Sequence, residues 1–185
     1  MKPIIVIIFA ASLLMLAGCD SAPSVPKEYI HTRAGFKITA PAHWKLISED
    51  HETFEFRRGD CKLIEVGSFD LDITRADIEA LTPDEFAAAI EEITLNAVKG
   101  YCEGAQITGY RVAERMPYKW ENMPGFRMKI IGYSDAADEN MVTDAIIGLN
   151  KEQLRIYGFF SQIIEADYDE TADDLEMSIA SFQLL

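Results

Sequence analysis

Basic side chains are scarce in this chain of 185 residues. Seventeen Lys and Arg stand against 31 Asp and Glu, which gives a formal net charge of −14. Nucleic-acid binding needs clustered Lys and Arg to neutralise phosphates, so this charge balance argues against a nucleic-acid partner. It also argues against binding of the domain surface to anionic lipid headgroups. The acidic excess is typical of a surface that maintains solubility, with binding of a basic protein as the alternative.

Motifs of catalysis and metal binding are also missing. The three histidines, His31, His43 and His51, have no H-E-x-x-H spacing or other ligand spacing. Gly132–Ala136 has a superficial likeness to the G-x-S-x-G turn of hydrolases, but no histidine follows Ser134 in the sequence, and a plain hairpin end is expected there. We therefore expect no catalytic residues, no metal and no cofactor.

Cysteine is rare as well, with three in the chain. There is no C-x-x-C pair, which argues against a thioredoxin-like redox role. Cys61 and Cys102 enclose a loop of about 41 residues, and a disulfide between them would contribute roughly 4 kcal/mol in the chain-entropy model. An oxidising compartment would favour this disulfide, while two free buried thiols are the alternative.

The apolar run at the N-terminus is too short for a transmembrane helix, which needs about 20 apolar residues. Lys2 precedes an apolar stretch from Ile4 to Leu16, and Ala17-Gly18-Cys19 follows it. A positive end, a short apolar core and small residues before a cleavage site are typical of a secretory signal. The segment resembles the lipobox of bacterial lipoproteins. This resemblance implies that residues 1–18 are removed and that Cys19 receives acyl chains, which would anchor the protein to a membrane.

Asp20 refines the expected location. In enterobacterial lipoproteins an aspartate after the lipidated cysteine resembles the signal for retention at the inner membrane. This implies an anchor on the periplasmic face of the inner membrane, with the outer membrane as the alternative. Residues 19–28 are rich in Ser, Ala and Pro and form a linker of at most roughly 30 Å. A single folded domain is expected over residues 29–185.

Hydrophobic periodicity predicts the elements of this domain. The clearest helix begins at Thr82, where Thr82-Pro83-Asp84-Glu85 offers a capping box, and it ends at Gly100. A final helix is expected over Tyr168–Phe182, and a shorter helical turn over Thr74–Leu81. Alternating or apolar runs predict strands at Phe36–Ile38, Thr53–Arg57, Lys62–Phe69, Gln106–Val112, Phe126–Ile130, Met141–Leu149 and Gln153–Phe160.

This element order predicts an α+β fold, in which helices pack on an antiparallel β-sheet. Gly35-Phe36-Lys37-Ile38 followed by Pro41-Ala42-His43-Trp44 resembles the opening strand of PsbP/Mog-like domains. Ile179-Ala180-Ser181-Phe182 resembles their closing helix. Members of that group are mostly accessory, assembly or binding proteins, and the resemblance implies no catalytic residues.

The best candidate for recognition is the expected loop from Pro117 to Gly125. Tyr118, Trp120 and Met123 place large side chains between two strands, where they could anchor a protein partner. The alternative is that they fold back over the sheet. We therefore expect a non-enzymatic, membrane-anchored lipoprotein that binds or helps to assemble another envelope protein.

A small-ligand carrier or sensor is the alternative function. Its pocket would lie between the sheet and the helices. Tyr157, Phe159 and Phe160 are the residues expected to line it.

Overall fold

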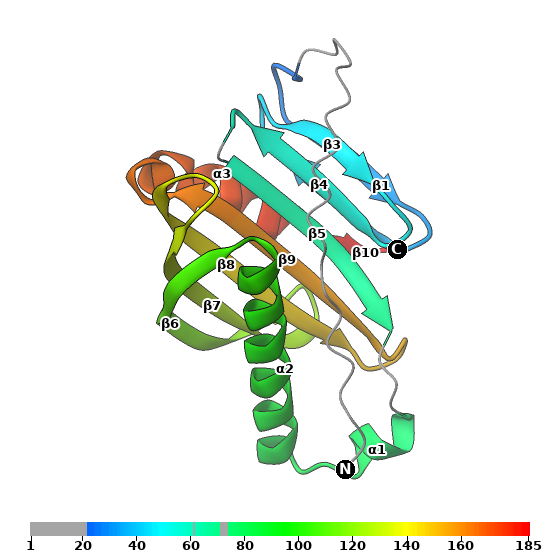
Figure 1. The fold of residues 1–185 in the computed structure, drawn as a ribbon. Helices are drawn as coiled ribbons and strands as arrows, with labels where there is room; N and C mark the ends of the chain where they lie inside the picture. The colour runs from blue at the N-terminus through cyan, green and yellow to red at the C-terminus, as the bar shows by residue number, and fades with distance from the viewer. Residues whose placement is uncertain (1–21, 61, 71–73) are drawn as a thin grey trace.

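The computed structural model describes residues 22–60, 62–70 and 74–185 (Figure 1). Cys19, Asp20 and Cys61 lie outside these ranges, so the lipidation, the inner-membrane retention and the boundaries at residues 18 and 28 stay predictions. Within the described ranges, no helix is long and apolar enough to cross a membrane.

A seven-stranded antiparallel sheet forms the centre of the molecule (Figure 1). Its strand order is β3-β4-β5-β9-β8-β7-β6, and each neighbouring pair is antiparallel. The long edge strand is β6, and β3 is the short one. The strands are β3 (Lys45–Glu49), β4 (Thr53–Arg58), β5 (Lys62–Asp70), β6 (Ile107–Trp120), β7 (Met123–Ser134), β8 (Glu139–Asn150) and β9 (Arg155–Ile164).

A second, three-stranded sheet joins the two ends of the described chain. The strands β1 (Lys27–His31) and β10 (Gln183–Leu184) both pair with β2 (Phe36–Ala40). Its order is β1-β2-β10. The start of the domain is therefore hydrogen-bonded to its last residues, although about 150 positions separate them in the sequence.

The first two helices begin at capping residues that can be recognised in the sequence. Short α1 (Arg75–Glu79) and long α2 (Pro83–Gly104) each start with a complete capping box, at Thr74 and Thr82 respectively. A 3₁₀ turn, η1 (Glu165–Asp167), leads into α3 (Tyr168–Ser181).

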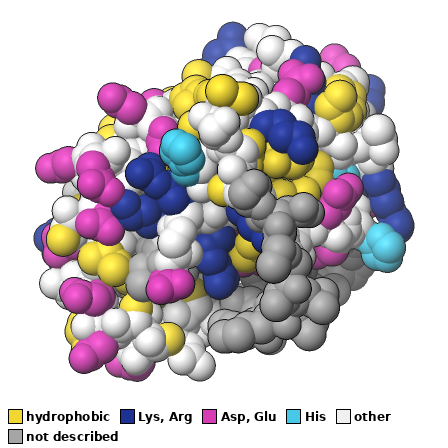
Figure 2. All heavy atoms as spheres, turned by 90° about the horizontal axis from the view of Figure 1, so that it is seen from above, with side chains coloured by type: hydrophobic (Ala, Val, Ile, Leu, Met, Phe, Trp, Pro, Cys, Tyr) yellow, Lys and Arg dark blue, Asp and Glu magenta, His cyan; other side chains and the backbone are white. Residues whose placement is uncertain are grey.

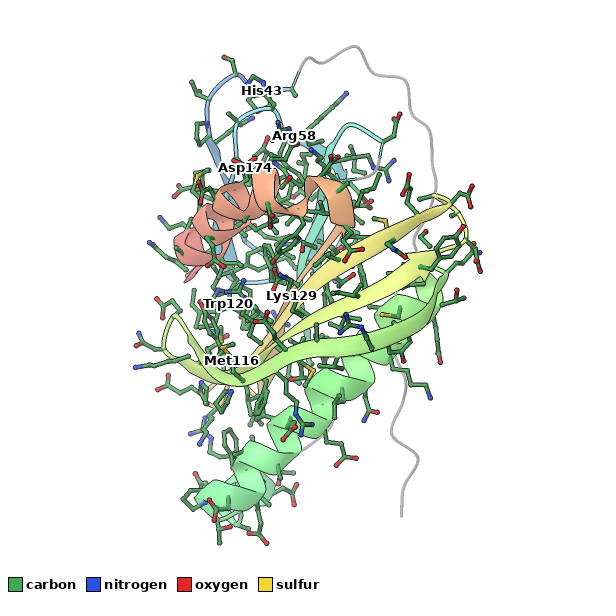
Figure 3. The ribbon with its side chains drawn as sticks, turned by 90° about the vertical axis from the view of Figure 1, so that its left-hand side faces the viewer. His43, Arg58, Met116, Trp120, Lys129 and Asp174 are labelled. Carbon is green, nitrogen blue, oxygen red and sulfur yellow. The ribbon has the colours of Figure 1, made fainter. Side chains whose placement is uncertain are left out.

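Neighbouring residues of the central strands point to opposite faces of the large sheet, as the period of a strand requires. On one face, called the α2 face here, Ile147 and Phe160 join the core under α2. On the other, the α3 face, Ile146 and Phe159 join a core closed by α3 and the small sheet. Figure 3 shows β6–β8 with α3 on one side and α2 on the other.

Contacts from α3 to distant strands fix it on its face. Asp174 accepts hydrogen bonds from Trp44 Nε1 and from an Arg58 guanidinium nitrogen, both at 3.0 Å. Figure 3 shows Arg58 and Asp174 close together above the strands. Lys62 pairs with Glu170 one turn earlier. These contacts hold the N-terminal half of α3 against β4 and β5.

The α+β prediction is confirmed, and so are most of the predicted elements. The predicted loop at Pro117–Gly125 is wrong, because β6 and β7 continue through it and leave only Glu121 and Asn122 as the turn. Strand β3 escaped prediction because three of its five residues are exposed and its sequence, Lys-Leu-Ile-Ser-Glu, does not alternate.

Candidate functional site: a groove between α2 and the β6–β7 hairpin

The β6–β7 hairpin turns within two residues. Trp120 pairs with Met123 across the turn, and Glu121 adopts the left-handed conformation with φ of 54°. A non-glycine residue at positive φ is uncommon, and here it is what closes the hairpin. The tip is therefore tight.

Trp120 and Met123 anchor this hairpin to the core, each with only 2% of its surface exposed. The Trp120 indole donates a hydrogen bond to the carbonyl of Ile179 at 3.0 Å, and its ring lies 4.1 Å from that of Phe182. The prediction that these two residues are exposed partner-binding anchors is wrong, because a two-residue turn brings them directly onto the sheet. Tyr118 is half-buried and contacts the same core.

Gly125 allows the hairpin to approach strand β8 closely. A Cβ atom at Gly125 would lie 2.1 Å from the carbonyl oxygen of Ile147, which is closer than any side chain permits. This position therefore requires glycine. Gly125 also borders open space on the α2 side of β7.

That open space is a groove of about 470 Å³ between the first half of α2 and the hairpin. Phe86, Ala87 and Ile90 form the helical wall, and the opposite wall comes from the hairpin. The hairpin residues that line it are Pro117, Tyr118, Lys119, Asn122, Pro124, Gly125 and Phe126. The groove therefore contains much of the segment singled out from the sequence, but not Trp120 or Met123.

Cations surround this apolar groove. Lys119 is the single charged residue in its lining, and it makes no ion pair with any described residue. The Lys151 ammonium lies 3.7 Å from the ring centroid of Phe86 and covers one end of the helical wall. Arg115, four residues before Lys119 on β6, pairs with Glu91 of α2 at 2.9 Å. The rim of the groove is basic in an acidic molecule.

A second, polar cleft of about 190 Å³ lies on the α3 face. Asp144 is buried at its base and accepts hydrogen bonds from Arg127 and Tyr168. Burial alone would lower the pKa of Arg127, but its bonds to Glu176 and Asp144 raise it overall. Burial and the bond to Asp144 raise the pKa of Tyr168. Figure 3 places Lys129 in this region, and its ammonium covers the Tyr168 ring at 4.0 Å. Arg127 therefore pairs with Asp144 at the base of this cleft, and the Lys129 ammonium lies over the Tyr168 ring.

Cys102 is buried and has no disulfide partner among the described residues. Its predicted partner Cys61 lies outside the described residues, so the disulfide stays a prediction. Burial, with a smaller contribution from Glu103, raises the pKa of the Cys102 thiol to about 12. The thiol is protonated at neutral pH and is a poor nucleophile.

The other residues considered for catalysis or metal binding have structural contacts. His31 is buried, with its Nδ1 accepting from the Ala34 backbone and its Nε2 3.0 Å from the Asp50 carbonyl. Ser134 is buried at the end of β7, as expected for a hairpin end. Among the described residues, no group of three or more His, Cys, Asp or Glu is arranged to hold a metal.

The predicted aromatic ligand pocket is wrong. Tyr157, Phe159 and Phe160 are all buried. Tyr157 and Phe159 belong to the core of the α3 face, while Phe160 stacks on Tyr101 in the core of the α2 face. Adjacent strand residues cannot line one pocket because they point to opposite sides of the sheet.

Comparison with known proteins shows what this architecture resembles. No protein-family profile matches the chain, and no curated protein matches its sequence. Among solved structures, the cyanobacterial PsbP of Synechocystis has a TM-score of 0.61 at 13% identity, over 94% of this chain and 99% of that one. The Ran-binding protein Mog1p of Saccharomyces cerevisiae has a TM-score of 0.57 at 9% identity, over 86% and 95%.

A third similar structure is LpqN, described as involved in cell envelope biogenesis of Mycobacterium tuberculosis. It has a TM-score of 0.51 at 8% identity, over 88% of this chain and 85% of that one. At such low identities these likenesses show the fold alone. They define the class of this domain, an α+β domain with the PsbP/Mog1-like fold, and they confirm the fold predicted from the sequence.

Proposed function

We propose that this protein is a lipid-anchored, non-enzymatic accessory that binds another envelope protein in the groove between α2 and the β6–β7 hairpin. The observation that carries the proposal is the groove itself, an apolar surface on an otherwise acidic domain. Exposed apolar surface is costly for a soluble domain and typically marks an interaction site. A groove walled by Phe86 and Ile90 would hold apolar side chains of a partner.

The position of the tether supports this proposal. The linker enters the domain beside His43, whose backbone N–H donates to the carbonyl of Pro23 at 2.7 Å. Figure 3 shows His43 at the top of the molecule and Met116, on the hairpin strand β6, in the lower half. The lipid on Cys19, held on the inner membrane by Asp20, would attach to the upper end. The groove would then face away from the membrane and toward a partner.

The chemistry of the polar groups supports a binding role. Asp144, Arg127 and Glu176 form a closed set of ion pairs, and the Cys102 thiol is protonated and buried. A catalytic group needs access to substrate and a pKa suited to its task. The groove itself is lined by apolar side chains, one lysine and one asparagine.

Photo-crosslinking in native membranes tests the proposal. Benzoylphenylalanine placed at Ala87, an exposed residue in the helical wall of the groove, should capture one envelope protein in stoichiometric amounts. The matched control is Asn96, exposed on the same helix and about 13 Å further along it. Capture at Ala87 but not at Asn96 would place the partner in the groove.

A groove-blocking pair of variants completes the test. Ala87→Glu adds a bulky side chain within the groove, whereas Ala88→Glu adds the same side chain on the neighbouring exposed position. Capture from a probe at Asn122 should fall in the first variant and not in the second. Absence of any captured protein at Ala87 and Asn122 would overturn the proposal.

The groove also keeps the small-ligand alternative open. Its volume of about 470 Å³ falls within the range of small-molecule sites, which is about 300–1,000 Å³. A carrier or sensor would gain thermal stability with one class of apolar compound. Ala87→Glu should abolish that gain, and Ala88→Glu should leave it unchanged.

A further inference from the structure

The charge of the molecule is divided unevenly, and the groove lies in its basic part. The β6–β7 hairpin, residues 107–134, carries five Lys or Arg and two Glu, while the rest of the chain carries 12 basic and 29 acidic residues. Figure 2 looks onto the end of the molecule that is uppermost in Figure 1, where acidic side chains gather along the left-hand rim, on the side of α3 and the β7–β8 turn. The acidic excess of the chain therefore lies outside the β6–β7 hairpin.

Two ammonium groups flank the groove without a carboxylate partner among the described residues. Lys119 lies in the lining and makes no ion pair there, and Lys151 contacts only the face of the Phe86 ring. Acidic residues outnumber basic ones by almost two to one in this chain, so most lysines are expected to have a carboxylate nearby. Lys119 and Lys151 depart from this expectation among the described residues. Most other cations near the sheet, such as Arg115 and Arg127, have an acidic partner.

The helical wall adds to the positive field. Phe86, Ala87 and Ile90 belong to the first turns of the 22-residue helix α2, whose N-terminus carries partial positive charge. Asp84 and Glu85 in the same turn offset part of it, and the Glu85 carboxylate is held by the N–H and hydroxyl of Thr82 in the capping box.

We infer that the segment of the partner that occupies the groove is apolar and acidic, with Asp or Glu side chains that pair with Lys119 and Lys151. This inference rests on the proposed function, since it names the chemistry of the partner in the same groove. Apolar side chains of the segment fill the space between Phe86 and the hairpin. The flanking carboxylates supply the ion pairs that the domain leaves open, and they direct the segment to the β6–β7 hairpin.

Side chains of the partner, and not pairing along the edge of β6, hold the segment. Strand β6 is the last strand of the sheet and is exposed over most of its length. Its register with β7 shifts twice between Thr108 and Glu114, and Pro117 has no N–H to donate. These features oppose the regular hydrogen bonding that an added strand requires. The groove and its two lysines remain as the attachment.

Charge reversal in the full-length protein tests the inference. With the crosslinker at Ala87, Lys119→Glu with Lys151→Glu should lower the capture yield roughly tenfold, because two exposed ion pairs would be replaced by repulsion. Lys119→Arg with Lys151→Arg should retain the yield. The matched control is Lys99→Glu, which changes an exposed lysine of α2 that faces Glu103, and it should leave capture unchanged.

Salt gives a second readout. Capture in the unmodified protein should fall between 50 mM and 500 mM NaCl, because salt screens exposed charges, and the double Glu variant should lose this dependence. Strong capture that neither charge reversal nor salt reduces would overturn the inference while the proposed function stands. Absence of capture from probes at both Ala87 and Asn122, with no other change in the protein, would overturn the proposed function itself.

Discussion

The two faces of the large sheet are closed in different ways. The α3 face is covered by a helix and a second sheet, and its core contains both tryptophans, Trp44 and Trp120, fully buried. The α2 face is covered by one helix, and Phe86, Ile93 and Ala97 of that helix stay half-buried. A single straight helix cannot cover seven strands. The groove forms between the first half of α2 and the turn end of the β6–β7 hairpin.

The two faces also differ in how their buried aromatic side chains are hydrogen-bonded. On the α3 face, both indole N–H groups donate at 3.0 Å, Trp44 to Asp174 and Trp120 to Ile179. On the α2 face, the buried hydroxyl of Tyr101 has no partner among the described residues. The α3 face thus holds both tryptophans by hydrogen bonds, and the groove lies on the α2 face.

The largest expected effect comes from breaking the α3 face. Trp120→Ala removes a buried indole and its hydrogen bond to Ile179, so the free energy of unfolding should fall by about 3–5 kcal/mol. Urea denaturation measures it, with Tyr118→Ala, a half-buried neighbour, as the smaller comparison. Equal losses in the two variants would contradict the anchoring role given to Trp120.

The next effect concerns Glu65 on the α2 face. Burial, with the nearby carboxylates of Glu55 and Asp50, raises the pKa of Glu65 to about 7. The folded protein then holds a proton that the unfolded chain releases between about pH 4.5 and 7, so stability falls as pH rises through this window. Above pH 7 the penalty reaches roughly 3 kcal/mol.

Glu65→Gln should remove that pH dependence. At pH 8 the variant should be more stable than the unmodified protein, by up to roughly 3 kcal/mol, while at pH 5 the two should differ little. Denaturation at both pH values measures the difference, and Glu92→Gln, at an exposed position on α2, is the control. Equal stability at pH 8 would show that Glu65 is solvated.

A smaller effect is expected at the start of α2, beside the groove. Thr82→Ala removes both hydroxyl contacts of the capping box and should cost about 1 kcal/mol. Thr82→Ser should cost less because it keeps the hydroxyl. Thermal unfolding of the two variants tests whether this cap stabilises the helical wall.

The smallest effect is expected on the exposed edge. Met116 on β6 is 44% exposed, so Met116→Ser should change the free energy of unfolding by less than about 0.5 kcal/mol. A loss as large as that of Trp120→Ala would mean that β6 is covered in solution. The same denaturation assay makes the comparison.

The sequence predicted the elements whose pattern reflects burial on one or two sides. Thr53–Arg57 alternates because β4 is half-buried, and Met141–Leu149 is apolar because β8 is buried on both faces. The cap at Thr82 was also legible, since capping depends on residues close in sequence. These signals are local, and the structure confirms them.

The groove could not be predicted in the same way. Its walls come from Phe86 and from the hairpin about 30 residues later, and only the strand order brings them together. The sequence Arg-Val-Ala-Glu-Arg-Met-Pro-Tyr-Lys does not alternate, because β6 is exposed on an edge. Its position between two strand patterns predicts a loop over Pro117–Gly125, with Trp120 as an exposed anchor on it. The segment Pro117–Gly125 supplies the hairpin wall of the groove, but Trp120 and Met123 within it are buried and are not exposed anchors.

The irregular edge of β6 would have a consequence if the protein is lipid-anchored as we propose. Such an anchor would confine copies to two dimensions, where a long bare strand would meet the same strand of its neighbour at high local concentration. Two such edges in register would extend one sheet into the next and begin an aggregate. The register shifts before Glu114 and the missing N–H of Pro117 interrupt that pairing. The long exposed edge of β6 is thus poorly suited to pairing with a second copy.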